Sequence, residues 1–129
     1  MADASTRQKV KWQKQMAKSL NDIYDHCFGL AQDPALKKDP TIAKDPSCNQ
    51  AAFRQHASDI TAQMTWLNSE ISTTSTAFVK AASDELKVHV AKVNDRAQIL
   101  TSIAYTVATL NDFLVLVDQS AAIAAGVMH

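Results

Sequence analysis

Two cysteines are the residues whose chemistry is easiest to read from this sequence. Cys27 and Cys48 are the only ones in 129 residues, and they are too far apart for a CxxC redox or zinc motif. A disulfide between them would close a loop of about 20 residues and stabilise the fold by about 3 kcal/mol. We therefore predict a Cys27–Cys48 disulfide, which indicates an extracytoplasmic protein, periplasmic or secreted. The alternative is a cytoplasmic protein with two buried free thiols.

The acidic and histidine residues do not form a recognisable catalytic or metal-binding set. Glu70 and Glu85 are the only glutamates, too few for a carboxylate-bridged di-iron site in a helical bundle. The histidines are distant from one another along the chain: His26, His56, His89 and His129. The sequence also lacks the signatures of zinc proteases, haem attachment, serine hydrolases and phosphate-binding loops. We expect no catalysis, no cofactor and no metal ion.

A hexapeptide that begins with Asp-Pro occurs three times in residues 33–50, as DPALKK, DPTIAK and DPSCNQ. Aspartate suits the N-cap and proline suits the first helical position, so each unit is expected to form one short helical turn. The apolar member of each unit should point inward: Leu36, Ile42 and Cys48. The repeat is either an ordered linker over one end of the fold or a recognition loop. In a recognition loop, Asp39 and Pro40 are candidate partner-binding residues.

The positions of glycine and proline indicate long helices. The sequence has two glycines and three prolines, and the long stretch between Ser47 and Ala125 contains neither. A β fold would need turns there, and turns normally use these residues. Apolar residues instead recur every three or four positions, which is typical of helices.

We predict an all-α fold, a single helical-bundle domain over residues 1–129. The long helices are expected over residues 5–32, 49–82 and 84–125, with the Asp-Pro repeat as the loop 33–48. They form an antiparallel bundle of three. The alternative is that the last helix breaks, near Asn94 and Asp95, and gives a bundle of four.

The predicted helix 49–82 has an unusual polar face. The run of Ser and Thr at residues 72–76 has poor helix propensity. We nevertheless place the turn just before Ser83, because that residue is a good N-cap for the next helix. The outer face carries Ser, Thr and Gln in place of charged residues, which favours a contact surface. Thr65 and Ser69 on this face are candidate partner-binding residues.

The last third of the chain is almost without charge. Residues 97–129 contain two charged side chains, Asp112 and Asp118, and Phe113–Val117 is apolar at every position. A helix that is apolar all round lies at the centre of a bundle or in an interface, so we predict a homodimer through the helix 84–125. The longest uncharged apolar stretch is shorter than the roughly 20 residues of a membrane span, and we expect no span. Asp118 lies at a solvent edge or contacts a partner or ligand.

The charge balance excludes one broad class of function. Lys plus Arg equals Asp plus Glu, at 13 each, so there is no surplus of cations for binding nucleic acid. We predict a non-catalytic helical module that binds a partner protein, as an inhibitor, an immunity-type protein or an adaptor. The alternative is an extracytoplasmic sensory or ligand-binding bundle, with a small apolar or aromatic molecule beside Trp12, Trp66 or Tyr105.

Overall fold

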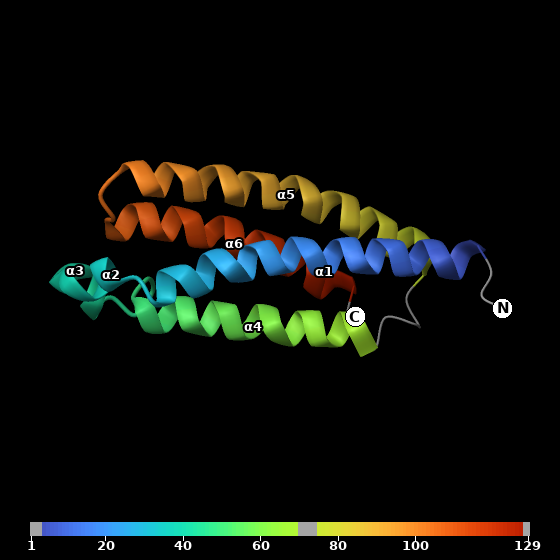
Figure 1. Cartoon of the computed structure of the whole chain (residues 1–129), viewed down its shortest axis with the longest axis horizontal. Helices are drawn as coiled ribbons and strands as arrows, with labels where there is room; N and C mark the ends of the chain where they lie inside the picture. Colours follow the sequence, from blue (N-terminus) through green and yellow to red (C-terminus); the bar gives the residue numbers. More distant parts are fainter. Residues whose placement is uncertain (1–3, 70–74, 128–129) are drawn as a thin grey trace.

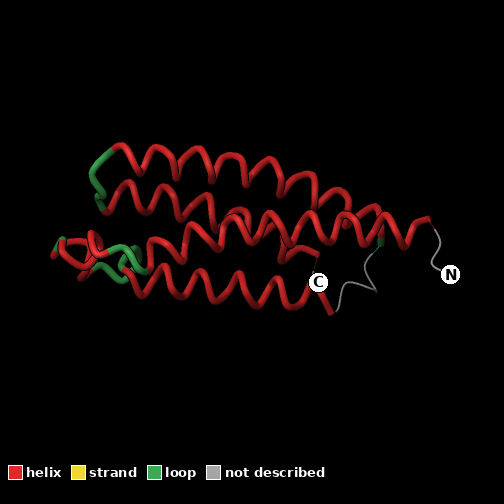
Figure 2. The backbone as a smooth tube through the Cα atoms, viewed as in Figure 1, coloured by secondary structure: helices red, strands yellow, loops and turns green. Residues whose placement is uncertain are grey.

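The structure of the protein is a computed structural model. It describes the backbone of residues 4–69 and 75–127 and the side chains of residues 7–67 and 75–126. The described part is helical with short connections, so the predicted all-α class is confirmed (Figure 2). The elements are α1 (Ala4–Ala31), α2 (Pro34–Lys38), α3 (Pro40–Lys44), α4 (Gln50–Ser69), α5 (Thr76–Ser102) and α6 (Val107–Val127).

Four long helices lie side by side, and the two short helices cover one end of them (Figure 1). Successive long helices run in opposite directions, so α1 and α5 run parallel to each other (Figure 1). Helix α1 packs against both α4 and α5, and α6 packs mainly against α5. The carboxyl ends of α1 and α5 therefore meet at the end that carries α2 and α3.

The predicted apolar stripe of α1 forms the centre of the core. Its residues recur at steps of three and four and are fully buried: Met16, Leu20, Ile23 and Cys27. The other long helices contribute further fully buried side chains: Phe53, Leu67, Leu86, Val93, Leu110 and Phe113. The Phe53 and Phe113 rings lie 6.2 Å apart between centroids, which joins α4 to α6 inside this core.

The Asp-Pro repeat forms the local structure expected from its sequence. Asp33 caps α2 by accepting a 2.9 Å hydrogen bond from the backbone N–H of Ala35, and Asp39 caps α3 in the same way. Asp45 accepts a 2.9 Å bond from the backbone N–H of Ser47 at the third turn. The apolar residue of each unit is buried, as predicted: Leu36, Ile42 and Cys48. Each cap satisfies an N–H group that a short helix leaves without a partner.

The prediction of one helix over residues 49–82 is wrong. Helix α4 ends at Ser69 and α5 begins at Thr76, with Ser75 as its N-cap. The Ser75 hydroxyl accepts a 3.2 Å hydrogen bond from the backbone N–H of Phe78, which offsets the poor helix propensity of this region. Ser83, the predicted cap, instead lies buried within α5. Part of the Ser/Thr run falls in residues 70–74, outside the described residues.

The prediction of one helix over residues 84–125 is also wrong, and the four-helix alternative describes the chain better. The break lies at residues 103–106 and not at Asn94, which is within α5. Ile103 is extended (φ −129°, ψ 162°). Thr106 and Thr109 then exchange hydrogen bonds: each backbone N–H donates to the other hydroxyl, at 2.9 and 3.1 Å. This reciprocal pairing is a capping box built from two threonines.

The break allows one chain to cover most of its own apolar segment. Phe113, Leu114 and Val117 are buried, whereas Val115 is 53% exposed. The homodimer through this segment stays a prediction. The segment Val107–Gly126 is long and apolar enough to cross a membrane, and only a third of it is buried. Core helices of soluble proteins can have the same length and composition. The absence of a span therefore also stays a prediction.

Candidate functional site

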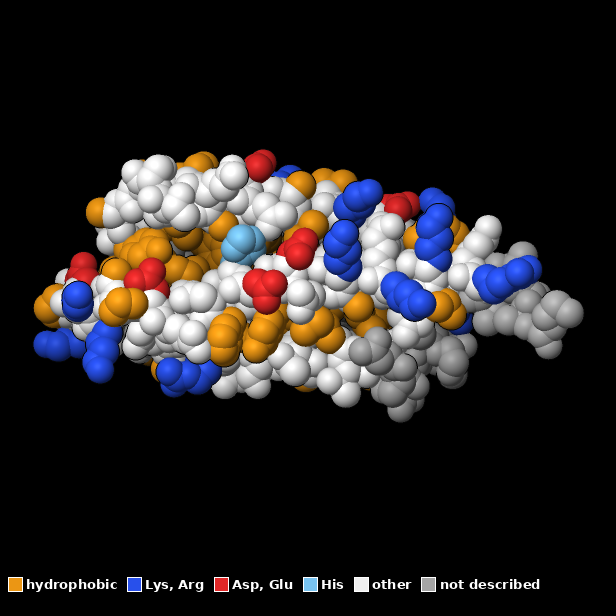
Figure 3. Space-filling model, viewed as in Figure 1, with side chains coloured by type: hydrophobic (Ala, Val, Ile, Leu, Met, Phe, Trp, Pro, Cys, Tyr) orange, Lys and Arg blue, Asp and Glu red, His pale blue; other side chains and the backbone are white. Residues whose placement is uncertain are grey.

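A hollow lies between the carboxyl-terminal halves of α1 and α5, next to the segment that leads into α6. Its volume is about 300 Å³. In Figure 3 it is the orange recess beside a pale-blue histidine, with red acidic side chains near its edge. It is lined by Asp25, His26, Gly29, Leu30, Asp33, Asn94, Ala97, Gln98, Leu100, Thr101 and Tyr105.

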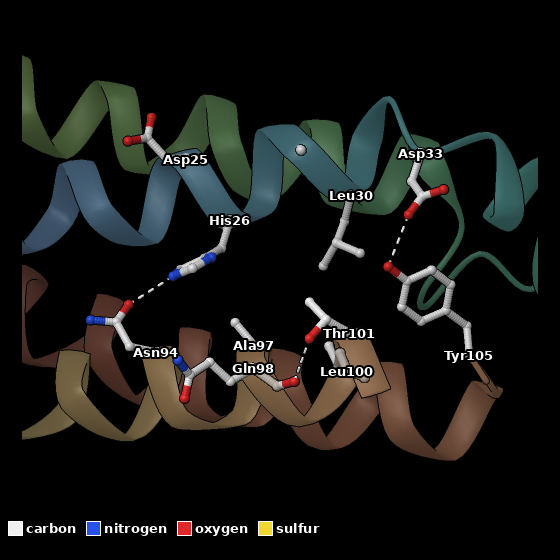
Figure 4. Close-up of a pocket in the computed structure, with 11 residues that line it drawn as sticks. Asp25, His26, Leu30, Asp33, Asn94, Ala97, Gln98, Leu100, Thr101 and Tyr105 are labelled. Carbon is white, nitrogen blue, oxygen red and sulfur yellow. Dashed lines mark hydrogen bonds between the residues drawn. The ribbon is translucent and has the colours of Figure 1, made fainter. Parts of the chain in front are cut away.

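His26 and Asn94 form one end of the hollow (Figure 4). The His26 Nε2 atom lies 2.7 Å from Asn94 Oδ1. Since an amide oxygen only accepts hydrogen bonds, His26 Nε2 carries the donated proton. The His26 ring also meets the edge of Phe113 on α6, at 6.2 Å between centroids and close to perpendicular. The core thus fixes the position of this imidazole between α1 and α5.

Asp33 and Tyr105 form the opposite end of the hollow (Figure 4). The Tyr105 hydroxyl donates a 2.9 Å hydrogen bond to Asp33 Oδ2, while Asp33 Oδ1 still caps α2. Partial burial and the neighbouring Asp33 carboxylate raise the pKa of the Tyr105 phenol. Tyr105 therefore stays a neutral donor. This bond ties the α5–α6 connection to the start of the Asp-Pro repeat.

Between the two polar ends, the hollow is mainly apolar. Figure 4 shows Leu30 from α1 facing Ala97 and Leu100 from α5. The alanine is small enough to leave this space open between two helices that otherwise pack through larger side chains. The arrangement is an apolar floor with one polar pair at each end, which is the usual composition of a small-molecule site.

A second groove, of about 560 Å³, adjoins the hollow on the side of α2 and α3. Its walls include Ala35, Asp39 and Ile42 from the repeat and Ile103 and Ala104 from the α5–α6 connection. It shares three lining residues with the hollow: Leu100, Thr101 and Tyr105. Tyr105 therefore stands between the two spaces.

The structure brings together two of the residues singled out from the sequence and separates the others. Asp39, proposed for partner binding, and Tyr105, proposed for ligand binding, line the same groove. Pro40 is exposed at the start of α3. Trp12 lies toward the opposite end of the bundle, where the Lys80 ammonium sits 5.7 Å from its ring centroid. Trp66 is partly buried near the end of α4, against the core.

The polar residues predicted for partner binding make contacts within the chain. The Thr65 hydroxyl donates to the backbone oxygen of Thr61 at 3.0 Å. Asp118 is exposed and lies 3.0 Å from His56 Nε2, while His56 Nδ1 lies 2.9 Å from the backbone oxygen of Ala52. Asp118 and the backbone of α4 thus both contact the His56 ring. The side chain of Ser69 lies outside the described part of the structure.

The predicted disulfide is not formed in the structure. Cys27 and Cys48 are free thiols, and both are buried. Burial, with a smaller contribution from the nearby Asp118 carboxylate, raises the pKa of the Cys27 thiol to about 12. Cys48 instead lies beside Ser47 and Asp45 in the last turn of the repeat, and burial raises its pKa as well.

Sequence reasoning missed the His26–Asn94 pair, which forms one end of the hollow. The two residues are 68 positions apart. His26 follows the core residue Ile23 by three positions, so its partial burial on α1 could have been inferred from the stripe. Its partner on α5 could not, because periodicity gives the face of a helix and not the neighbour of that face.

Comparison with protein-family models, with curated proteins and with solved structures found no match for this chain. Among the residues that the structure describes, no group of three or more His, Cys, Asp or Glu side chains is placed to hold a metal ion.

Proposed function

We propose that the protein is a non-catalytic helical binding module that holds a small, mainly apolar molecule in the hollow between α1 and α5. The observation that carries this proposal is the apolar floor of Leu30, Ala97 and Leu100 with a polar pair at each end. The volume of about 300 Å³ is at the lower end of the usual range for small-molecule sites, about 300–1,000 Å³.

The surrounding structure supports this function because the walls are held by the core. Leu100 is buried in the core on α5, and Leu30 on α1 packs against the same core. Tyr105 is held by its bond to Asp33, at the place where the groove meets the hollow. A site whose walls are positioned before binding loses little conformational entropy when the ligand enters.

The experiment that tests this function fills the hollow from within. Ala97→Leu places a larger side chain on the floor, and Ala91→Leu makes the same change at an exposed position of the same helix. We expect 2-phenylethanol, followed by two-dimensional NMR, to shift the signals of residues that line the hollow in the wild type and in Ala91→Leu. Ala97→Leu should abolish saturable binding with unchanged helicity. Equal binding by Ala97→Leu, or shifts spread over the whole surface, would contradict the proposal.

A second candidate function, binding of a partner protein, is favoured by the groove beside α2 and α3. The groove is larger than the hollow, and Ile103 at its wall is 43% exposed although it is strongly apolar. Asp39 adds a charge to the lining of the groove. Exchange of Ile103 for Asp should abolish binding of a partner protein, while Val88→Asp, at an exposed apolar position within α5, should not.

A further inference from the structure

We propose that the ligand of the hollow is a small organic cation: a protonated primary or secondary amine on an apolar body. This inference rests on the proposed function and specifies its ligand. The ammonium group would lie at the Asp33–Tyr105 end, and the apolar body would cover Leu30, Ala97 and Leu100.

The charges around the hollow favour a cation. Its described lining residues include two carboxylates, Asp25 at the rim and Asp33 at one end, and neither a lysine nor an arginine. The adjoining groove adds Asp39 and again no cationic side chain among its described lining residues. A ligand with a carboxylate or phosphate would meet these acidic groups without a lysine or arginine in the lining to pair with, which is unfavourable in a partly desolvated site.

The helix ends contribute electrostatics of the same sign. Because α1 and α5 run parallel, both carboxyl termini lie at this end of the bundle (Figure 1). Each terminus carries a partial negative charge from the helix dipole, and cations are stabilising there. Neither helix places a basic residue in its last turn. The nearby amino end of α6 is already capped by Thr106 and Thr109.

The hydrogen-bonding groups at the Asp33 end are acceptors. Tyr105 donates its proton to Asp33, and Thr101 donates its own to the backbone oxygen of Gln98 at 2.7 Å. The oxygen atoms of both hydroxyls and of the Asp33 carboxylate therefore have only acceptor capacity left. A ligand at this end must supply the donors, and an ammonium group supplies up to three of them.

The remaining donors lie at the other end of the hollow. Figure 4 shows the side-chain amides of Asn94 and Gln98 on the side remote from Asp33. Tyr105 adds an aromatic ring near the acidic end, and a cation over such a ring gains further attraction. Charge, helix ends and hydrogen-bonding capacity thus point to the same class of ligand at the same end.

The test uses three probes of similar shape and different charge: 2-phenylethylamine, which is protonated at pH 7, 2-phenylethanol and phenylacetate. Affinities are measured by NMR titration on the full chain. We expect the amine to bind at least about five-fold more tightly than the alcohol, since charge-assisted hydrogen bonds are about twice as strong as neutral ones. Phenylacetate should bind more weakly than the alcohol.

A matched pair of variants assigns the preference to Asp33. Asp33→Asn removes one charge and keeps a good N-cap, and Asp45→Asn makes the same change at a cap that does not line the hollow. The preference for the amine should disappear in Asp33→Asn and persist in Asp45→Asn. Equal binding of amine and alcohol by the wild type overturns the cation inference and leaves the proposed function intact. Binding of none of the probes overturns both.

Discussion

Gly29 offers a sharp test of the helix that forms one wall of the hollow. It lies within α1, two residues before the helix ends, and its backbone does not have a positive φ. A Cβ atom added at Gly29 would meet no atom within 4 Å outside its two chain neighbours and the local helix backbone. Gly29→Ala should therefore remove the conformational cost of glycine without a steric penalty. Glycine in a helix costs roughly 0.5–1 kcal/mol relative to alanine.

The expected gain in the free energy of unfolding is thus about 0.5–1 kcal/mol, which for a chain of this length corresponds to a rise in Tm of about 2–4 °C. Urea titration and thermal unfolding, both followed by circular dichroism, measure it. Gly126→Ala is the matched control: its Cβ also has free space, but it lies one residue before the end of α6, so the gain should be smaller. A lower Tm for Gly29→Ala would refute both the helical backbone and the open space assigned here.

Two further perturbations test the core and the start of α5. Burial raises the pKa of the Cys27 thiol to about 12 in the folded protein, against 9.0 in the unfolded chain. Because the unfolded chain loses this proton first, the free energy of unfolding should fall by about 1 kcal/mol per pH unit as the pH rises through that interval. Cys27→Ala should flatten this slope in urea titrations between pH 8 and 11; an unchanged slope would show that Cys27 does not cause it. Ser75→Ala should lower the free energy of unfolding by about 1 kcal/mol through loss of the cap. Ser83→Ala should lower the free energy of unfolding far less, because the buried Ser83 hydroxyl has no hydrogen-bond partner in the structure. A larger loss for Ser83→Ala than for Ser75→Ala would support Ser83 as the cap.

The features predicted correctly from the sequence are those set by neighbouring residues. Asp33 and Asp39 each precede a proline, and this pair of residues specifies a helix start without help from the rest of the chain. The stripe that contains Met16 and Leu20 identifies the buried face of α1 because it is repeated over many turns.

The helix boundaries were harder to predict because an apolar stripe can continue across a break. The spacing from Phe53 to Phe78 fits one helix, yet Phe78 is half exposed and belongs to α5. Two helices that are separated by a short break but face the same core can show the same apolar spacing as one continuous helix. The N-cap decides between the two, and both Ser75 and Ser83 are suitable residues for that position.

The candidate site was predicted only in part for a related reason. Tyr105 and Asp39 were singled out as types of residue that often bind, and each lies in the groove. The sequence gives no sign that Asp33 and Tyr105, 72 positions apart, are hydrogen-bonded. That contact depends on where α5 ends: the break at residues 103–106, which was not predicted there, brings Tyr105 beside the carboxyl end of the parallel helix α1.

The parallel alignment of α1 and α5 affects the order in which the helices pack during folding. An antiparallel pair such as α1 and α4 can form as soon as the repeat between them has turned, since the closing loop is short. The hollow forms only when α5 packs against α1, and the chain between these two helices includes the whole of α4. Closing so long a loop costs more entropy. A nascent or truncated chain that ends at α4 therefore has no hollow at all. Ligand capture would then distinguish the finished protein from its own partly folded precursors.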